Sequence, residues 1–213
     1  MQLTLKNGKV LEAESGLSAA EITKRISEGL FREALCVKLD GRLADLSAKI
    51  ENDCRFEVVT FDDDEGKSVY RHTAAHVLAQ AVNSIYPTVK LAIGPSVENG
   101  FYYDFDFVSK ISAEDFQKIE AEMNKIIKAD FVIEKFSLSK ADAIKQVKKF
   151  GEDYKLELIN DLPDGSPVTF YRQGDFVEMC RGPHLPSTGK IKAFKLTSIA
   201  GAYWRGNEKI KML

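Results

Sequence analysis

The sequence predicts an α+β protein built from two domains. Hydrophobic residues alternate with polar ones in some short runs, which is typical of strands, and recur every three or four positions in others, which is typical of helices. An acidic, glycine-containing stretch at 62–68 separates a compact first part, 1–61, from a longer second part, 62–213. With 213 residues, 44% of them hydrophobic and 29% charged, the chain has the composition of a soluble globular protein.

The first part begins with a hairpin signal and a helix. Asn-Gly at 7–8 lies between two short alternating runs, which indicates two antiparallel strands joined by a tight turn. Ser18 and Glu21 form the pattern of a capping box, which opens a helix that continues to about Leu30. We therefore expect a β-hairpin followed by one helix.

The rest of the first part is predicted to form further strands. Residues 35–39 alternate before an Asp-Gly turn at 40–41, and a last strand covers 56–61. Two strands, a helix and further strands favour a small β-grasp domain of the ubiquitin type. Nothing in it looks catalytic, so we expect a docking or spacer module.

The acidic stretch 62–68 is interpreted as a linker, with Ser68 as the N-cap of a following helix. That helix is expected to end near Tyr86, because a proline follows. It carries His72 and His76 one turn apart on one face. This face lies opposite the apolar positions of the helix, so we do not expect the histidines to be core fillers.

The second part is predicted to be α+β as well, with a mostly antiparallel sheet and helices. The expected strands cover 89–93, 101–107, 131–138, 156–159, 168–171 and 176–179. Ser112 and Ser139 mark the starts of two helices. Asp104 and Asp106 share one face of a predicted strand, where we interpret them as solvated carboxylates rather than as an acid pair.

The tail from Lys190 to Lys211 is basic and contains Tyr203 and Trp204. Basic residues mixed with aromatic ones suit an RNA backbone and an unstacked terminal base. A packed aromatic pair is the alternative interpretation.

Charge and composition exclude several classes of protein. The net charge of −2 gives no chain-wide field that would attract nucleic acid. No apolar run is long enough to span a membrane and no signal peptide is evident, which points to the cytosol. Cys36, Cys54 and Cys180 are odd in number and scattered, so we expect reduced thiols.

All three histidines of the chain lie in two short motifs. The sequence Arg-His-Thr-Ala-Ala-His carries His72 and His76, and Cys-Arg-Gly-Pro-His carries Cys180 and His184. Glycine and proline prevent the second motif from being helical throughout, so it is a loop or strand end that can approach the helix. Three imidazoles and a thiol brought together in this way predict a metal site or a hydrolytic site.

Three kinds of chemistry remain open at these residues. Imidazole and thiolate suit Zn²⁺, but no glutamate lies between His72 and His76, so the zinc-peptidase motif is absent. Cys180 next to a histidine could act as a nucleophile. A metal-free hydrolase would use an imidazole to orient or deprotonate water and a lysine or backbone amide to hold the oxyanion.

Together with these two motifs, three further segments resemble the amino-terminal half of bacterial threonyl-tRNA synthetases. They are Leu-Ala-Ile-Gly-Pro at 91–95, Asn-Gly-Phe-Tyr-Tyr-Asp at 99–104 and Ala-Gly-Ala-Tyr-Trp-Arg-Gly at 200–206. The resemblance covers essentially the whole chain. Residues 1–61 look like the TGS domain of that family, and residues 62–213 look like its editing domain, which alanyl-tRNA editing proteins share.

The resemblance implies hydrolytic proofreading. The editing domain of the family hydrolyses seryl-tRNA mischarged on the tRNA for threonine and releases serine. A pocket fitted to the serine hydroxyl can exclude the extra methyl group of threonine, which is the second sieve of a double-sieve scheme. The implied partners are the 3′ acceptor end of that tRNA, carrying serine, and the remainder of the synthetase chain, with no membrane and no DNA.

The resemblance also assigns site residues. Its editing site is lined by the catalytic residues His72, His76, Cys180 and His184 and by Lys155, which matches a lysine assigned to catalysis.

Two further matches concern substrate binding. Tyr103 matches a pocket tyrosine, and Glu178 stands where the family commonly has an aspartate that contacts the amino group of the substrate. Editing is expected to need no cofactor, and a zinc ion, although not favoured, would be held by the four histidine and cysteine residues. Because no aminoacylation motif is present before Leu213, we expect no ATP binding. The alternative is a tRNA-binding module without activity, in which the same four residues hold a structural metal.

Overall fold

The computed structural model describes residues 1–206, 208–209 and 212–213. The chain forms two compact units, which we describe separately: residues 1–73 with 182–186, and residues 74–181 with 187–213. In the described part of the chain, no helix has an apolar run long enough to cross a membrane. The predicted domain boundary between residues 61 and 62 stays a prediction.

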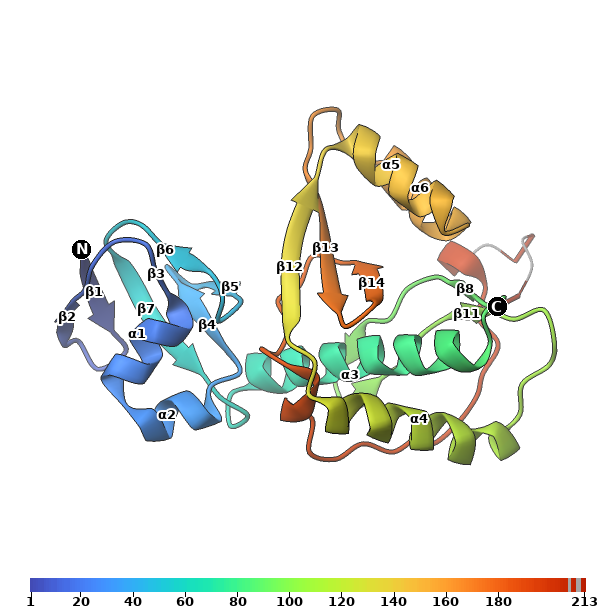
Figure 1. The fold of residues 1–213 in the computed structure, drawn as a ribbon, viewed down its shortest axis with the longest axis horizontal. Coiled ribbons are helices and arrows are strands. Elements are labelled where there is room, and N and C mark those ends of the chain that lie inside the picture. Colours follow the sequence, from blue (N-terminus) through green and yellow to red (C-terminus); the bar gives the residue numbers. More distant parts are fainter. Residues whose placement is uncertain (207, 210–211) are drawn as a thin grey trace. The chain divides into compact units, whose positions relative to one another are not determined.

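The first unit is built on a five-stranded sheet (Figure 1). The strand order is β2 (Val10–Glu12), β1 (Gln2–Leu5), β7 (Cys54–Val59), β4 (Cys36–Leu39) and β5 (Arg42–Ala44). β1 and β7 run parallel, whereas the other neighbours in this sheet are antiparallel. A short antiparallel pair, β3 (Leu17–Ser18) and β6 (Lys49–Ile50), lies beside it. Both predicted hairpins and the β-grasp fold are confirmed.

The helix predicted to reach Leu30 is in fact two helices. The capping box of Ser18 and Glu21 is present and opens α1 (Ala19–Ile26). At Ser27 the backbone is extended and the side chain accepts the N–H of Leu30, so this residue begins α2 (Glu28–Glu33). A serine can start a helix in this way because its hydroxyl replaces a missing backbone acceptor.

The prediction of a linker that ends with Ser68 as the N-cap of the next helix is wrong, because α3 (Asp64–Ile85) begins four residues earlier, at Asp64. The Asp63 carboxylate accepts the N–H of Thr60 at 2.9 Å, and two acidic residues fill the first turn, where the helix dipole favours negative charge. Gly66 permits this start, since a Cβ there would lie 1.8 Å from the Thr60 carbonyl oxygen. The helix is buried throughout residues 73–79, whereas the histidine face was expected to lie away from the core.

The second unit contains a three-stranded antiparallel sheet and two helices beside it (Figure 1). The elements are β12 (Ile133–Leu138), α5 (Lys140–Lys149), α6 (Asp153–Asn160), β13 (Val168–Gln173) and β14 (Phe176–Met179), with sheet order β12-β13-β14. The strand predicted at 156–159 is wrong, because these residues belong to α6. Leu156 and Ile159 pack into the same cluster as Val147 and Phe170. Two residues three positions apart share a face in a helix but not in a strand.

The predicted strands between residues 89 and 107 are much shorter in the structure. They are β8 (Lys90–Leu91), β9 (Ser96–Val97), β10 (Gly100–Phe101) and β11 (Phe105–Asp106), paired as β9 with β10 and β8 with β11. The run 101–107 is therefore not one strand. Its aromatic side chains nevertheless lie together, because the Phe105 ring lies 4.7 Å from that of Tyr103 and 5.6 Å from that of Phe107.

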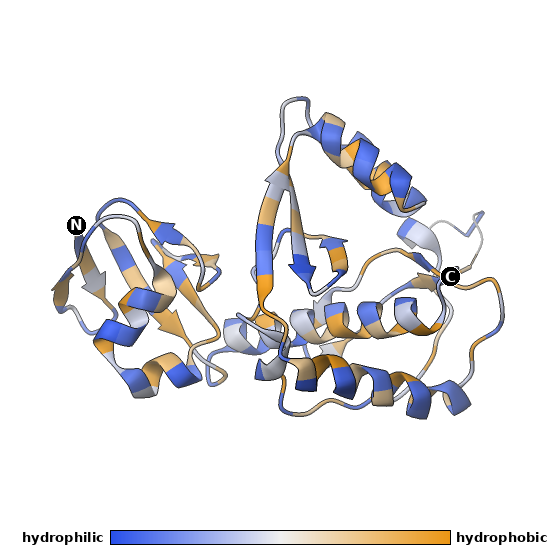
Figure 2. Cartoon of the chain, viewed as in Figure 1, coloured by the Kyte–Doolittle hydropathy of each residue, from blue (hydrophilic) through white to orange (hydrophobic). Residues whose placement is uncertain are grey.

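The helix predicted after Ser112 is confirmed. A short 3₁₀ turn, η1 (Ala113–Asp115), with a capping box at Ser112, leads into α4 (Phe116–Ala129). Hydrophobic and hydrophilic residues mix along α4 (Figure 2), and the buried ones recur at helical spacing, at Ile119, Met123 and Ile126. Such a stripe packs one side of the helix against the core.

The tail contains two short 3₁₀ turns, η2 (Thr188–Lys190) and η3 (Trp204–Gly206). Trp204 is only 2% exposed, donates its Nε1–H to Glu157 on α6 at 2.8 Å and contacts the edge of Tyr154. It is therefore a packed residue and not a free stacking platform, whereas Tyr203 is 43% exposed. Lys211, part of the predicted basic tail, lies outside the described residues.

Candidate active site

The second unit buries an ionised pair and a tyrosine in one group. Lys155 on α6 and Glu178 on β14 form an ion pair, and their side chains are 3% and 1% exposed. Tyr103, in the segment that joins β10 to β11, donates its hydroxyl proton to Glu178 Oε2 at 2.9 Å. Lys155 Nζ in turn donates to the Tyr103 oxygen at 3.3 Å. Three segments far apart in the sequence are thus tied together by charge-assisted hydrogen bonds.

The electrostatics of this group keep the tyrosine protonated. Burial, followed by the negative charge of Glu178, raises the pKa of Tyr103 well above its usual value of 10. Its hydroxyl is therefore a donor to the carboxylate at neutral pH. Removing one partner of such a buried pair would leave a charge without compensation, so the three residues are expected to act as a unit.

Glu152 adds a fourth group that the sequence analysis did not identify. It occupies the N-cap position of α6, one turn before Lys155. Burial, followed by repulsion from Glu178, raises the pKa of this carboxyl to about 7, although the charge of Lys155 lowers it. In the sequence, a glutamate three positions before a lysine looks like an ordinary surface pair of a helix, and so carries no signal of its own.

This carboxyl should make stability depend on pH. The folded-state pKa of Glu152 is raised from 4.5 to about 7, so its stabilising contribution is complete below pH 4.5 and is lost as the pH rises through 7. The glutamine in Glu152→Gln has no carboxyl proton to lose. We therefore expect the free energy of unfolding of this variant, relative to that of the native chain, to rise by roughly 2–3 kcal/mol between pH 5 and pH 8. Urea unfolding at both pH values measures this difference. An equal effect of Glu152→Gln on the free energy of unfolding at pH 5 and at pH 8 would contradict this prediction.

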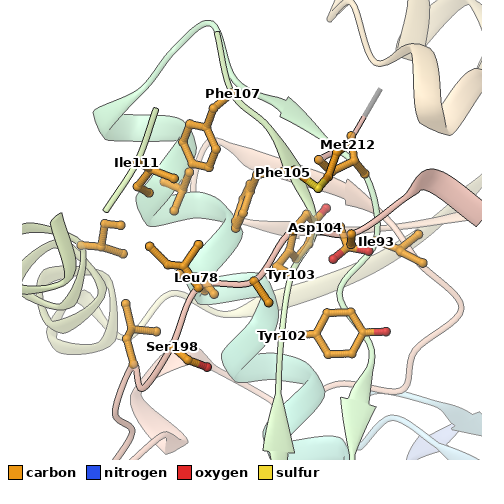
Figure 3. Close-up of a pocket in the computed structure, with 18 of the residues that line it drawn as sticks. Leu78, Ile93, Tyr102, Tyr103, Asp104, Phe105, Phe107, Ile111, Ser198 and Met212 are labelled. Atoms are coloured by element: carbon orange, nitrogen blue, oxygen red, sulfur yellow. The ribbon is translucent and has the colours of Figure 1, made fainter. Parts of the chain in front are cut away.

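Tyr103 also faces a cavity of about 920 Å³ in the second unit (Figure 3). Aromatic side chains, including those of Phe105 and Phe107, line it together with Leu78 from α3. Its lining in the described part of the chain includes neither Lys155 nor a histidine. Of Lys155, Glu178 and Tyr103, only Tyr103 therefore lines the cavity.

In the first unit, two of the predicted histidines are stacked. The rings of His72 and His184 lie 4.5 Å apart at 23°. The backbone N–H of His184 donates to Asp45 Oδ1 at 2.9 Å, which fixes the loop that carries it. His184 is buried and His72 partly exposed. Asp45 was not identified in the sequence analysis, because no motif marks it.

The Thr73 hydroxyl contacts the His184 ring and orients it. Its one proton is donated to the Val69 carbonyl at 2.9 Å, and its oxygen accepts the N–H of Leu185 at 3.1 Å. His184 Nδ1 lies 3.1 Å from the same oxygen. Because the hydroxyl has no second proton to donate, Nδ1 is the donor in this contact. In the neutral form of this ring, Nε2 then carries the lone pair that can accept a proton or bind a metal.

The other two predicted residues are His76 and Cys180. His76 on α3 is 3% exposed, and its carbonyl accepts a hydrogen bond from Gln173 at 3.4 Å. Cys180 directly follows β14, and its N–H donates to the Thr169 carbonyl of β13 at 3.0 Å. The four predicted residues are therefore divided between the two units, with His72 and His184 in the first and His76 and Cys180 in the second.

The donor set fits a zinc ion by type, because three imidazoles and a thiolate are common zinc ligands. The four residues therefore match zinc in the chemistry of their donor atoms.

Comparisons with known proteins agree with this arrangement of motifs. The family described as TGS domain matches residues 1–60, and the family described as threonyl and alanyl tRNA synthetase second additional domain matches residues 168–213. Threonine–tRNA ligases from Acetivibrio thermocellus, Clostridium novyi and Clostridium tetani are 55%, 56% and 54% identical over all 213 residues. The chain is thus similar over its whole length to parts of bacterial threonine–tRNA ligases. It spans about a third of the length of these relatives, 34%, 33% and 33% respectively.

The resemblance to threonine–tRNA ligases inferred from the motifs is therefore confirmed. This resemblance identified Lys155 as a site residue, whereas the sequence pattern alone did not predict the helix that carries it. Neither the pattern nor the resemblance pointed to Thr73 or Glu152. The roles of the individual residues remain predictions.

Gly94 provides a test of the position of Tyr103. A Cβ at Gly94 would lie 2.2 Å from Cδ2 of the Tyr103 ring, so Gly94→Ala must displace the ring from its contact with Glu178. We expect a loss of about 1–3 kcal/mol in the free energy of unfolding, the usual cost of overpacking, measured by urea unfolding. Gly100→Ala is the matched control, because a Cβ at Gly100 meets nothing within 4 Å. Equal stability of the two variants would contradict the prediction.

Proposed function

We propose that this chain is the editing part of a threonine–tRNA ligase and hydrolyses the ester that joins serine to the terminal ribose of the tRNA for threonine. The observation that carries the proposal is the buried group of Lys155, Glu178 and Tyr103. A buried ion pair costs desolvation energy and adds little to stability, so it is more readily explained by a role in chemistry.

The first step in this proposal is attack by water on the ester carbonyl. The imidazole of His72 takes a proton from the water as its oxygen bonds to the carbonyl carbon. The Lys155 ammonium donates to the carbonyl oxygen, which becomes negatively charged in the tetrahedral intermediate. Its ion pair with Glu178 holds the ammonium in place before the substrate arrives.

The second step is collapse of the intermediate. The carbon–oxygen bond to the ribose breaks, and the imidazolium of His72 returns its proton to the leaving ribose oxygen. Serine leaves with a carboxylic acid group, which loses the second proton of the water to solvent and becomes a carboxylate, and the tRNA ends in an intact ribose. Both protons of the attacking water are thus accounted for.

The remaining residues of the prediction would select the amino acid. In this proposal His76, Cys180 and His184 shape the pocket, and Tyr103 and Glu178 contribute to substrate binding. Serine fits such a pocket, and the extra methyl group of threonine does not. Because a single methyl group in a pocket is worth only about 1–3 kcal/mol, an editing step can add discrimination that aminoacylation alone lacks.

We further propose that editing requires no metal ion. If zinc were bound, His72, His76, Cys180 and His184 would hold it, and it would supply Lewis acidity to the carbonyl. Elemental analysis of the purified chain and deacylation in the presence of a chelator test this point. Stoichiometric zinc that is lost in His184→Ala, together with chelator-sensitive deacylation, would overturn the metal-free proposal.

The proposed partners follow from the relatives. They are the 3′ acceptor end of the tRNA for threonine, carrying serine, and the rest of a synthetase chain, with the reaction taking place in the cytoplasm. We propose no binding of ATP, DNA or membranes. The alternative is a tRNA-binding module in which the four histidine and cysteine residues hold a structural metal, and the donor types of these residues favour it.

One experiment separates these two functions. The chain is mixed with the tRNA for threonine charged with serine, and both tRNA binding and serine release are measured against the uncatalysed rate. An editing hydrolase releases serine with multiple turnovers. Binding of the charged tRNA with no release above the uncatalysed rate would support the non-catalytic module instead.

A further inference from the structure

The loop that carries His184 packs within the first unit. Residues 182–186 group with residues 1–73, whereas the segments on either side of this loop, 74–181 and 187–213, form the second unit. The loop nevertheless lies in the region that matches the second additional domain of the synthetases, and not in the region that matches the TGS domain. A short piece of the editing-related region therefore belongs to the same compact unit as the TGS domain.

Asp45 is the residue of the TGS domain that binds this loop. It directly follows β5 and is 6% exposed, and its Oδ1 accepts the backbone N–H of His184 at 2.9 Å. The carbonyl of Asp45 accepts the N–H of Ala48 at 3.0 Å, so the carboxylate is held by a closed turn. A buried backbone N–H needs an acceptor, and a carboxylate is a strong one.

The next backbone N–H along the loop is held by α3. The Thr73 hydroxyl accepts the N–H of Leu185 at 3.1 Å and also contacts the ring of His184. Both loop residues are 1% exposed. Two consecutive N–H groups thus bind two different elements, and together these contacts fix the His184 ring that stacks on His72.

We propose that Asp45 is a positioning residue for the editing reaction, so that the TGS domain contributes to the editing site through its hydrogen bond to the loop. This inference rests on the proposed function, in which His72 takes a proton from water. Asp45 acts through His184, because it holds the ring on which His72 stacks. A docking or spacer module, which the sequence analysis expected, would make no such contribution.

Removal of the carboxylate should release the loop. The N–H of His184 would be left without an acceptor in a buried position, and the loop would move until this group reaches water or another partner. The His184 ring would move with the loop and no longer support the ring of His72. Because a displacement of about 1 Å in a catalytic site can cost about 10²-fold in rate, even a small movement should be measurable.

The test compares Asp45→Ala with Asp45→Asn in the full chain. Serine release from seryl-tRNA for threonine is measured in single turnovers at saturating protein, and binding of the charged tRNA is measured separately. We expect Asp45→Ala to slow release at least about tenfold. Asp45→Asn keeps an oxygen acceptor at the same position, so its rate should remain within about threefold of the native rate. Neither substitution should change tRNA binding, because Asp45 is buried and acts through the loop.

Hydrogen exchange at the His184 amide, followed by NMR, reports the anchor without any reference to activity. We expect faster exchange at this amide in Asp45→Ala, while the amides of β4 keep their native protection, and native exchange at both places in Asp45→Asn. If the β4 amides of Asp45→Ala also exchange faster, all measurements are repeated in sucrose, which favours the folded state.

Asp53→Ala is the matched control. Asp53 is another carboxylate of the TGS domain that accepts a distant backbone N–H, that of Gln2 at 2.7 Å, but it is exposed and makes this contact at the surface. We expect the rate of serine release and the exchange of the His184 amide in this variant to equal those of the native chain.

Three results would overturn the inference. They are native serine release in Asp45→Ala, equal slowing in Asp45→Ala and Asp45→Asn, and unchanged exchange of the His184 amide in Asp45→Ala. If the native chain itself releases no serine, the proposed function fails. The two kinds of failure are distinguishable, because the second is seen without any variant.

Discussion

Lys155→Ala is expected to abolish serine release and to destabilise the second unit. The substitution leaves the Glu178 carboxylate 1% exposed and without its ammonium partner. Breaking a buried pair in this way costs about 3–5 kcal/mol. The loss of the cation that we propose stabilises the oxyanion should also lower the deacylation rate by a factor of about 10²–10³.

Urea unfolding and deacylation of seryl-tRNA measure the two effects separately. The matched control is Lys148→Ala on α5, an exposed lysine whose replacement should change neither. A double variant, Lys155→Met with Glu178→Met, removes both charges and should recover most of the stability, but none of the activity. If Lys155→Ala had native stability and native activity, both the ion pair and the proposed role of Lys155 would be contradicted.

His72→Ala is the second large effect that we expect. Loss of the proposed general base should slow serine release by about 10²–10⁴-fold. Because His72 is partly exposed and its ring contact is a stacking one, the stability should change by only about 1 kcal/mol. Binding of the charged tRNA should be retained, since the substitution removes a group that acts on water.

Single-turnover deacylation and a tRNA-binding measurement on the same preparation test this prediction. Ser84→Ala, at an exposed position of the same helix, is the control and should behave like the native chain. If His72→Ala retained a release rate close to the native one, another residue would have to be the base.

Local sequence signals predicted the parts of the fold that are stabilised locally. The Asn-Gly turn at 7–8 indicated the first hairpin, and the serines at 18, 112 and 139 are caps in the structure. Each of these features depends on a few neighbouring residues and on their own backbone. They could therefore be read from a single sequence.

The errors occurred where distant contacts determine the local structure. Residues 156–159 are apolar and short, so periodicity could not distinguish a strand from a helix. Packing against α5 and the sheet makes them part of α6. The start of α3 was missed because Gly66 resembles a linker residue, and only the contact with the Thr60 carbonyl explains its presence in a helix.

The candidate site also combines residues that a local sequence signal marks with residues that only distant contacts reveal. The histidine and cysteine motifs identified four candidate residues because their spacing is a local property, and the rings of His72 and His184 are stacked in the structure. Thr73 and Glu152 carry no such signal. Thr73 acts through its contact with His184, which is 111 positions away, and Glu152 through the charges of Lys155 and Glu178.

The central claim is that the chain is a serine-selective deacylase, and the most direct test compares two amino acids on one tRNA. The tRNA for threonine is charged with serine or with threonine, and the first-order release rates are measured with the native chain under identical conditions. Our account predicts rapid release of serine while threonine remains attached. Equal release of both amino acids, or release of neither above the uncatalysed rate, would contradict it.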